Sequence, residues 1–257
     1  MDIQKLYEAE TAYTSNFSKR EDTGVSLRFR DASIPDMYMH NMTVYPKRLD
    51  DETLRCEVQK ELDIRRKEKA DFLQLECYFT LEQAFLDTLP IPADYCVDDL
   101  MTISTEKFTT ISGNPECIVV PANDPAMLED GRRVDYLTSL HTGEDFATRR
   151  SVRRMRAYAE PNDLTLYVCY YKGEAVGKVE LFLHKGLAKI EEFNILDQHQ
   201  RKGFGTAAVR KLLEEARAKG IGTAYLVTSS DDTPREMYAK CGFTKAAEKS
   251  ELHFKLK

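Results

Sequence analysis

Two glycines separated by one residue, Gly203 and Gly205, stand immediately before an amphipathic helical run over 206–219. Glycine lets the backbone approach a bound group closely and turn its N–H groups toward it. The N-terminus of a helix adds free N–H groups and the positive end of a dipole. Arg201 and Lys202 add formal positive charge beside the turn. The pattern predicts a phosphate-binding turn, although a short motif also fits a tight strand-to-helix turn with solvated basic residues.

A dinucleotide-binding fold is one alternative, because residues 203–208 also fit the relaxed fingerprint G-x-G-x-x-A. That fingerprint places its first glycine directly after a buried parallel strand, whereas the polar stretch 197–202 intervenes here. The preceding strand-like run, 189–196, contains Glu191 and Glu192 and is not the continuous apolar run of a central parallel strand. It also follows a hairpin-like pair and does not open a βαβ unit. The sequence therefore disfavours the dinucleotide fold.

A second signal lies downstream of the first helix. Residues 223–228 read as a strand, and Asp231 with Pro234 predicts the start of a short helix. Gly242 is placed to end that helix. The two signals follow one another with a helix and a strand between them, which makes the pair more specific than either alone.

This pairing resembles the GCN5-related N-acetyltransferase (GNAT) superfamily. The family pattern Q/R-x-x-G-x-G/A matches Gln200, Gly203 and Gly205. A second family pattern, an Asn or similar residue seven positions before a Tyr, matches Asp231, Tyr238 and the Gly-Phe pair that follows. The family usually has Asn where Asp231 stands, and that difference would alter hydrogen bonding near the thioester.

The resemblance covers residues 115–257 and implies a GNAT acyl-CoA N-acyltransferase fold, an α+β fold with a mixed sheet. It also implies acetyl-CoA as a co-substrate and no metal. The cofactor-binding residues that it implies lie on the turn, on the strand before it and at the second motif: Phe193, Ile195, Leu196, Gln200, Arg201, Lys202, Gly203, Phe204, Gly205, Thr206 and Asp231.

The implied chemistry is transfer of an acetyl group to an amine, which attacks only when it is deprotonated. A general base helps directly or through water, and a backbone N–H stabilises the charge that develops on the thioester oxygen. In the family that donor comes from the strand before the turn. The departing thiolate needs a proton, and the matching family residue is Tyr238, since an unperturbed phenol has a pKa near 10. A packing role for Tyr238 is the alternative.

The base is predicted among the carboxylates of that same strand. Glu191 and Glu192 are expected on opposite faces, because successive strand residues alternate. Glu192 is favoured slightly over Glu191 as the base. A solvated strand carboxylate, with water alone acting as the base, is the alternative for either residue.

The order of predicted elements agrees with the motif. From residue 115 onward the pattern gives a strand at 116–121, a helix at 124–141 and a second helix through the arginine run. Three strands follow as an antiparallel meander, then the turn, its helix, a strand, the short helix and a final alternating strand. This β-α-α-β-β-β-α-β-α-β order is the order of the GNAT family.

The N-terminal part is an additional α+β domain over residues 1–110, joined to the second domain, 115–257, by residues 105–114. Helix-like and strand-like runs alternate in it: 25–30, 51–70, 72–79, 80–89 and 95–104. This order echoes the second half of a GNAT domain, yet no Gly-x-Gly stands before its helix. Residues 1–110 are therefore either a degenerate, cofactor-free GNAT-like copy, giving a tandem arrangement, or an unrelated cap. One continuous domain is the simplest alternative.

Composition and charge exclude several classes of protein. The chain has 257 residues, 42% hydrophobic and 31% charged, as in ordinary soluble globular proteins. No run is long enough to span a membrane, and the first residues lack the layout of a signal peptide, so we expect a cytoplasmic location. A net charge of −6 argues against general nucleic-acid binding. The histidines and cysteines show no metal-ligand spacing.

One local exception to the acidic charge is the run 149–156, which contains five arginines. On a helix, Val152 and Met155 share a face, while Arg149, Arg153 and Arg156 lie on another. A solvated basic helix face is the favoured interpretation. A patch that faces an acidic substrate or RNA is the alternative.

Three function classes remain open from the sequence. The first is an acetyltransferase for a small-molecule primary amine, working as a monomer or homodimer without nucleic acid or membrane. The second is a protein or peptide N-acetyltransferase. The third is a non-catalytic acyl-CoA-binding module. The intact motif residues Gln200, Gly203, Gly205 and Tyr238 favour catalysis, so the sequence predicts the first class.

Overall fold

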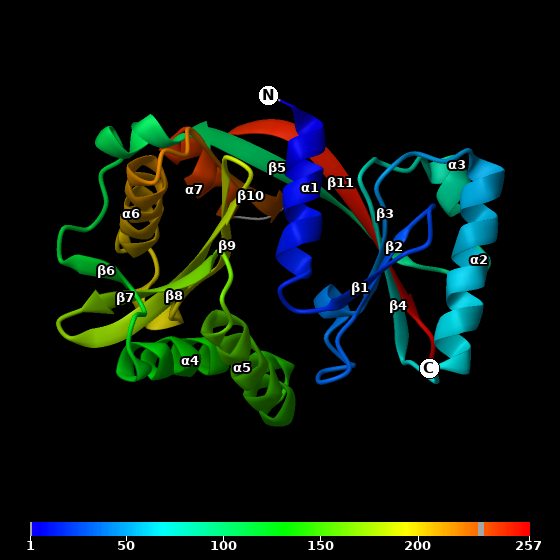
Figure 1. Cartoon of the computed structure of the whole chain (residues 1–257), viewed down its shortest axis with the longest axis horizontal. Helices are drawn as coiled ribbons and strands as arrows, with labels where there is room; N and C mark the ends of the chain where they lie inside the picture. Colours follow the sequence, from blue (N-terminus) through cyan, green and yellow to red (C-terminus); the bar gives the residue numbers. More distant parts are fainter. Residues whose placement is uncertain (1, 231–233) are drawn as a thin grey trace. The chain divides into compact units, whose positions relative to one another are not determined.

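The computed structural model describes residues 2–230 and 234–257. The chain forms two compact units, one of residues 1–100, 228–232 and 245–257, the other of residues 101–227 and 233–244 (Figure 1). These units differ from the predicted ranges 1–110 and 115–257, which stay predictions, because most of the last strand returns to the first unit. Strand β5 (Asp94–Ser104) begins in the first unit and ends in the second.

The first unit contains strands in the order β1-β2-β3-β4-β11-β5. Strands β3 and β4 are parallel, whereas β1 with β2, β2 with β3 and β4 with β11 are antiparallel. Its elements besides β5 are α1 (Ile3–Thr14), β1 (Lys19–Asp22), β2 (Leu27–Arg30), η1 (Tyr38–His40), β3 (Met42–Tyr45), α2 (Asp51–Lys67), β4 (Phe72–Cys77), α3 (Gln83–Leu86) and β11 (Thr244–Lys255).

Helix α2 shows how the sequence builds the core of this unit. The Asp50 side chain accepts a hydrogen bond from the Thr53 N–H at 2.9 Å and so caps the helix. Leu54, Val58 and Leu62 recur every four residues and are all buried against β4 and β11. The helix forms because its capping residue and its apolar stripe agree.

The second unit contains strands in the order β10-β9-β8-β7-β6, with the end of β5 beside β10. The pair β9 and β10 is parallel, and the pairs from β9 to β6 are antiparallel. Its other elements are η2 (Thr105–Thr109), β6 (Cys117–Pro121), α4 (Pro125–Ser139), η3 (Leu140–Thr142), α5 (Glu144–Ala159), β7 (Leu164–Tyr171), β8 (Glu174–His184), β9 (Leu187–Ile195), η4 (Asp197–His199), α6 (Phe204–Ala218), β10 (Thr223–Ser229) and α7 (Pro234–Cys241).

The sheet of the second unit has a different cover on each face. Helix α6 packs on one face, and α4 and α5 pack on the other (Figure 1). The face under α6 is apolar: Val209, Leu212 and Leu213 of the helix join Ala188 and Ile190 of β9 in one buried cluster. The opposite face holds buried charged side chains, which are described with the site below. Cofactor binding is predicted at the turn before α6 and on the strand that leads to it.

The predicted fold class, α+β with a mixed sheet, is confirmed. Every element predicted after residue 115 is present, most of them within a few residues of the expected bounds, but the final strand, predicted from residue 250, already begins at Thr244. In the first unit, α1, β1 and β3 were not predicted. The two strands lack the alternation of buried and exposed residues that marks a strand in the sequence, because β1 is a fully exposed run of charged residues and β3 is buried throughout.

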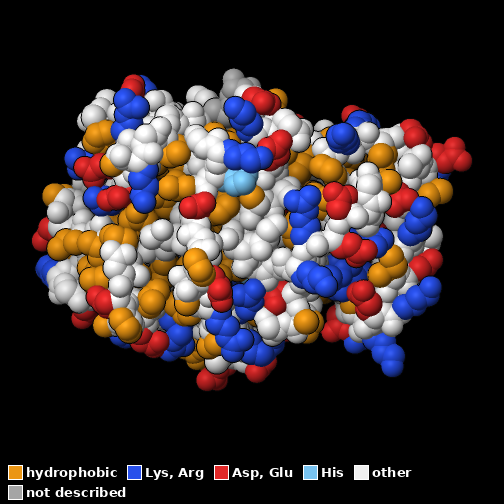
Figure 2. All heavy atoms as spheres, in the orientation of Figure 1, with side chains coloured by type: hydrophobic (Ala, Val, Ile, Leu, Met, Phe, Trp, Pro, Cys, Tyr) orange, Lys and Arg blue, Asp and Glu red, His pale blue; other side chains and the backbone are white. Residues whose placement is uncertain are grey.

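The surface agrees with the mixed composition of the chain. Figure 2 shows acidic side chains beside basic ones over much of the face in view, so no single broad basic area covers it. None of the helices within residues 2–230 and 234–257 is both long and apolar enough to cross a membrane.

Candidate active site

The turn before α6 leaves a helix N-terminus open. Gly203 stands at the N-cap position with φ +79°, a left-handed conformation that favours glycine, and Arg201 has φ +59°. The first helical bond runs from the Ala207 N–H to the Gly203 carbonyl at 3.1 Å. Within the described part of the chain no side chain caps this helix. The preceding N–H groups of the first turn therefore lack helical acceptors, as an anion-binding helix end requires.

This helix end borders a pocket of about 890 Å³ in the second unit. The walls come from the turn, the end of β9, the segment before β6 and helix α7. The lining residues are Thr110, Ile111, Ser112, Phe193, Ile195, His199, Gln200, Arg201, Gly203, Phe204, Gly205, Thr206, Glu236, Met237, Tyr238, Lys240 and Cys241. A pocket of this size with an open helix N-terminus in its wall suits a phosphate-bearing ligand.

Eight of the predicted cofactor residues line this pocket, and two described ones, Leu196 and Lys202, do not. Leu196 lies outside it and donates its N–H to the Val176 carbonyl at 2.9 Å, so that N–H is not available to a ligand. Lys202 also lies outside, with its ammonium on the Gln198 carbonyl at 2.6 Å. Asp231 falls outside the described residues.

Gly205 lies where three elements approach one another. A Cβ atom at this position would stand 3.0 Å from Met237 Sδ and 3.3 Å from Phe193 Cζ. Glycine therefore allows α6, α7 and β9 to meet at the pocket. The second glycine of the motif serves this close approach, whereas Gly203 serves the left-handed turn.

The segment before β6 is a part of the site that the sequence reasoning missed. The Asn114 backbone N–H donates to the Gly203 carbonyl at 3.0 Å, and its side-chain amide donates to the Lys202 carbonyl at 2.9 Å. A Cβ atom on Gly113 would overlap the backbone of Ala207 in α6. The segment is thus fastened across the start of α6. Its sequence signal is the Gly-Asn-Pro run of residues 113–115, which by itself indicates a connection.

We expect Gly113→Ala to destabilise the protein and to weaken CoA binding. The added methyl group must push the segment away from α6, and overpacking of this kind costs about 1–3 kcal/mol of unfolding free energy. Gly222→Ala is the matched control, because a Cβ there meets no atom within 4 Å. Denaturant unfolding and calorimetric titration with CoA check both variants. If Gly113→Ala behaves like Gly222→Ala in both measurements, the segment does not support the pocket.

Tyr238 is held in the pocket wall by its own helix. It is buried on α7, with its ring centroid 5.8 Å from Phe243 and 6.4 Å from Phe193. Its carbonyl accepts the Phe243 N–H at 3.0 Å, and Gly242, at φ +100°, ends the helix as predicted. The predicted proton donor therefore lies in the same pocket as the predicted phosphate turn.

Strand β9 contains a bulge where the sequence predicted regular alternation. Lys178 of β8 lies opposite Asn194, whereas Glu180 lies opposite Glu191, so β9 has one extra residue in this interval. Glu192 has φ +51°, a left-handed conformation that costs roughly 1–2 kcal/mol for a residue other than glycine. The expectation that Glu191 and Glu192 lie on opposite faces is wrong.

The bulge directs both carboxylates away from the pocket. Glu191 shares a face with Glu180, its cross-strand neighbour, and its carboxylate pairs with Lys189 at 2.9 Å. Glu192 contacts Lys178 on the same face. Neither glutamate lines the pocket. Phe193 and Ile195 take the opposite face and do line it.

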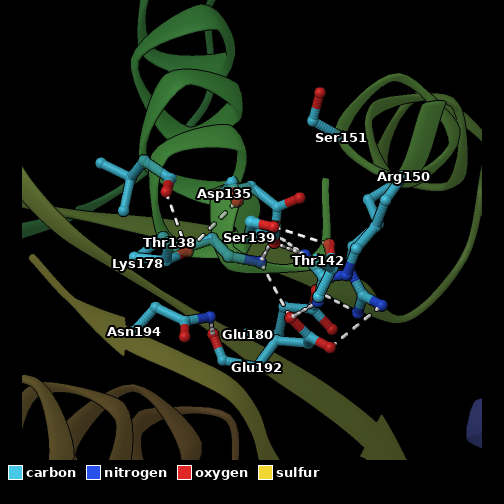
Figure 3. A network of polar contacts seen from close by, with 12 residues as sticks. Asp135, Thr138, Ser139, Thr142, Arg150, Ser151, Lys178, Glu180, Glu192 and Asn194 are labelled. Atoms are coloured by element: carbon cyan, nitrogen blue, oxygen red, sulfur yellow. Dashed lines mark hydrogen bonds and ion pairs between the residues drawn. The ribbon is translucent and has the colours of Figure 1, made fainter. Parts of the chain in front are cut away.

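Glu192 belongs to a network of buried charges beneath α4 and α5 (Figure 3). Its carboxylate accepts from Arg150 at 2.5 Å and from Lys178 at 3.1 Å, and it lies 3.3 Å from Arg154. Arg150 also pairs with Asp135 at 2.5 Å, and Lys178 pairs with the same carboxylate. Three cations thus meet three carboxylates, the third being Glu180, which pairs with Arg154 at 2.5 Å.

The network sets the protonation state of Glu192. Burial acts to raise the pKa of this carboxyl, but the charges of Arg150, Arg154 and Lys178 outweigh burial and hold the pKa well below its usual value. A carboxylate so strongly stabilised is a weak base at neutral pH. The assignment of Glu192 as the base stays a prediction, and the geometry weighs against it.

The network also shows that the arginine run 149–156 does not form a uniformly solvated helix face. Arg154 is 2% exposed and Arg150 is 12% exposed in their side chains, because both turn inward toward the sheet. Arg149 lies outside and pairs with Asp145 at 2.9 Å, four residues earlier on α5. Two of the arginines are therefore structural and are not part of a solvated basic face.

Comparisons with known proteins agree with the site. Residues 133–243 match the model of the acetyltransferase (GNAT) family. The uncharacterized N-acetyltransferase CgeE of Bacillus subtilis strain 168 is 37% identical over 124 residues, which are 46% of this chain and 48% of that protein. The chain thus spans about half the length of this curated relative.

Solved structures match nearly the whole chain. A functionally unknown protein of Staphylococcus epidermidis has a TM-score of 0.75 at 15% identity, covering 93% of this chain and 94% of its own. A GCN5-related N-acetyltransferase of Kribbella flavida has a TM-score of 0.71 at 14% identity, covering 98% and 95%. A tandem GNAT protein from the clavulanic acid biosynthesis pathway has a TM-score of 0.58 at 12% identity, covering 91% and 81%.

These structural likenesses show the fold, and they confirm a GNAT fold over the whole chain with tandem GNAT-like neighbours. The family that the residue match identifies uses acyl-CoA. The predicted resemblance is confirmed in the C-terminal half of this chain, where residues 133–243 match the GNAT acetyltransferase family.

Proposed function

We propose that the protein transfers the acetyl group of acetyl-CoA to a primary amine of a small molecule. The observation that carries the proposal is the uncapped N-terminus of α6, which opens through the left-handed Gly203 into the pocket that also contains Tyr238. An anion-binding site at one end and a proton donor at the other are what a CoA thioester needs.

The residues of the pocket fit the parts of the cofactor. The open N–H groups of α6 and the exposed guanidinium of Arg201 would hold the phosphates. Phe193 and Ile195 offer apolar surface toward Tyr238, where the uncharged arm would lie. Gln200 braces the turn itself, since its amide donates to the Ile195 carbonyl at 3.1 Å and to Asp197 at 2.9 Å.

Bound acetyl-CoA would supply the activated acetyl group. In the proposed reaction the chain orients that group beside β9, excludes water with Phe193 and Met237, and holds a transferable proton on the Tyr238 hydroxyl. The amine loses its proton to water or to a carboxylate. Glu191 and Glu192 of β9 are the predicted carboxylates, but neither lines the pocket, which favours water. The ammonium form of such a substrate is a cation, which a chain of net charge −6 attracts.

The proposed acceptor is a small molecule, and the proposed form of the enzyme is a monomer or homodimer that needs neither nucleic acid nor a membrane. A protein or peptide acceptor and a non-catalytic acyl-CoA-binding role are the outcomes that the following experiment separates from it.

The full chain is titrated by calorimetry with CoA, acetyl-CoA and NAD, and then assayed for thiol release with a panel of small amines and N-terminal peptides. The expected result is binding of both CoA forms, no measurable NAD binding, and turnover with a small amine. Binding of NAD more tightly than CoA would support the dinucleotide alternative. Turnover with peptides alone would identify a peptide acetyltransferase, and binding without any turnover would indicate a binding module.

A further inference from the structure

The bulge in β9 joins the ion network to the cofactor pocket. On one face of the strand, the Glu192 carboxylate contacts Arg150, Arg154 and Lys178 (Figure 3). On the other face, the next residue, Phe193, lines the pocket. The bulge therefore connects helices α4 and α5, which do not line the pocket, with the strand that does.

The network binds the carboxylate of Glu192, the residue that has the left-handed conformation. The cations come from two different elements, Arg150 and Arg154 from α5 and Lys178 from β8, so they constrain the carboxylate from separate directions. Lys178 and Asp135 are fully buried, and removal of one partner from a buried ion pair leaves an uncompensated charge. Glu192 cannot withdraw its carboxylate without leaving Lys178 and Arg150 short of a partner.

Regular pairing would change what faces the pocket. Because strand side chains alternate, a shift of one residue sends each later side chain to the opposite face. Without the bulge, Phe193 would leave its position beside Gly205, and Ile195 would leave the pocket wall. The correct lining of the pocket thus depends on the extra residue in β9.

We propose that Arg150, Lys178 and Glu192 are positioning residues for acetyl transfer, which fix the bulge and so the direction of β9 residues 193–195 beside the thioester. This inference rests on the acetyltransferase function proposed above. It gives Glu192 the role of an anchor in place of the role of a base. The residues act through the strand, since none of the three lines the pocket.

The first test compares Arg150→Met with Arg149→Met in the full chain. Methionine keeps an unbranched stem but removes the charge, and Arg149, which is 37% exposed and pairs with Asp145, is the matched control. We expect Arg150→Met to lower kcat by about 10–100-fold, because a misplacement near 1 Å at a reacting centre can cost about 100-fold. The Kd for CoA should stay within about threefold, since the phosphates bind at α6. Wild-type kcat in Arg150→Met would overturn the proposal.

A charge-balanced pair separates an anchor from a base. Glu192→Gln removes one negative charge and leaves an excess cation, whereas Glu192→Gln combined with Lys178→Met restores two cations to two carboxylates. If Glu192 is an anchor, the double variant should regain at least about tenfold in kcat over Glu192→Gln, as coupled neighbours do in a double-mutant cycle. If Glu192 is the base, the double variant should be as slow as the single one, which would overturn the inference.

A readout that does not need turnover keeps this inference distinct from the proposed function. Hydrogen exchange is followed in the peptide that covers β9 for Arg150→Met, Arg149→Met and the wild type. Amides of residues 193–195 should exchange at least about tenfold faster in Arg150→Met alone, because opening of the bulge exposes them. Unchanged exchange would show that the network does not hold the bulge. If the wild type transfers no acetyl group to any amine, the proposed function fails, and a role of these residues in acetyl transfer fails with it. If the wild type is active but hydrogen exchange in Arg150→Met is unchanged, only the anchoring role of the network is rejected.

Discussion

Gly205→Asp is expected to weaken CoA binding by more than about 100-fold. Gly205 lies in the first turn of α6 and lines the pocket, and a side chain there would enter the space beside Met237 and Phe193. The new carboxylate would also face bound phosphate. Two like charges about 4 Å apart repel by roughly 4 kcal/mol at an effective dielectric constant of 20, and each 1.4 kcal/mol is about tenfold in affinity. Calorimetric titration with CoA measures the loss.

Gly205→Asn is the control that separates charge from volume. The two side chains have nearly the same shape, but only aspartate repels phosphate. A carboxylate near a helix N-terminus stabilises the helix. The thermal unfolding temperature of Gly205→Asp should therefore be no lower than that of Gly205→Asn. If the two variants bind CoA equally well, charge at the turn is unimportant. Wild-type affinity in Gly205→Asp would remove the phosphate site from α6 altogether.

The phosphate turn was predictable because its signals are local. Gly203 adopts φ +79°, and Gly205 allows the close approach of Met237 and Phe193. Both glycines lie within one turn of the start of α6, so a short stretch of sequence contains the whole signal. Tyr238 could be placed for the same reason, since Gly242 ends its helix four residues later. Spacing alone carries such information, and most of the predicted turn residues line the pocket.

The bulge was not predictable because its cause is not local. Nothing in the segment Lys189–Leu196 distinguishes an extra residue from regular alternation. The carboxylate of Glu192, the residue that has the left-handed conformation, is bound by Arg150, 42 residues earlier, and by Lys178 on the neighbouring strand. Regular alternation therefore predicts Glu191 and Glu192 on different faces of the sheet. In the folded chain the bulge places both on the same face.

The burial of part of the arginine run was also not predictable from the local sequence. Helical periodicity separates the faces of α5, but it does not say which face meets a carboxylate in another element. Arg150 can be buried because its guanidinium pairs with Asp135 of α4 and Glu192 of β9. A buried cation needs its partners, and those partners are known only once the helices and strands have been assembled.

Tyr238→Phe is expected to lower the rate of acetyl transfer by about 10²–10⁴-fold, the usual contribution of general acid catalysis. Phenylalanine keeps the ring that packs near Phe243 and Phe193, so the fold and the Kd for CoA should barely change. The hydroxyl that would protonate the departing thiolate is lost. Thiol release with the best amine of the panel measures kcat, and calorimetry measures the Kd.

Tyr171→Phe is the matched control, because this tyrosine packs near the turn, with its ring centroid 5.0 Å from Phe204, but does not line the pocket. The comparison requires that chemistry limits the rate, since slow product release would hide a loss at the chemical step. A pre-steady-state burst in the wild type would reveal such a limit, and single-turnover rates then replace kcat. If Tyr238→Phe keeps the wild-type rate when chemistry limits, Tyr238 only packs against its neighbours, and the thiolate must take its proton from water or from another group.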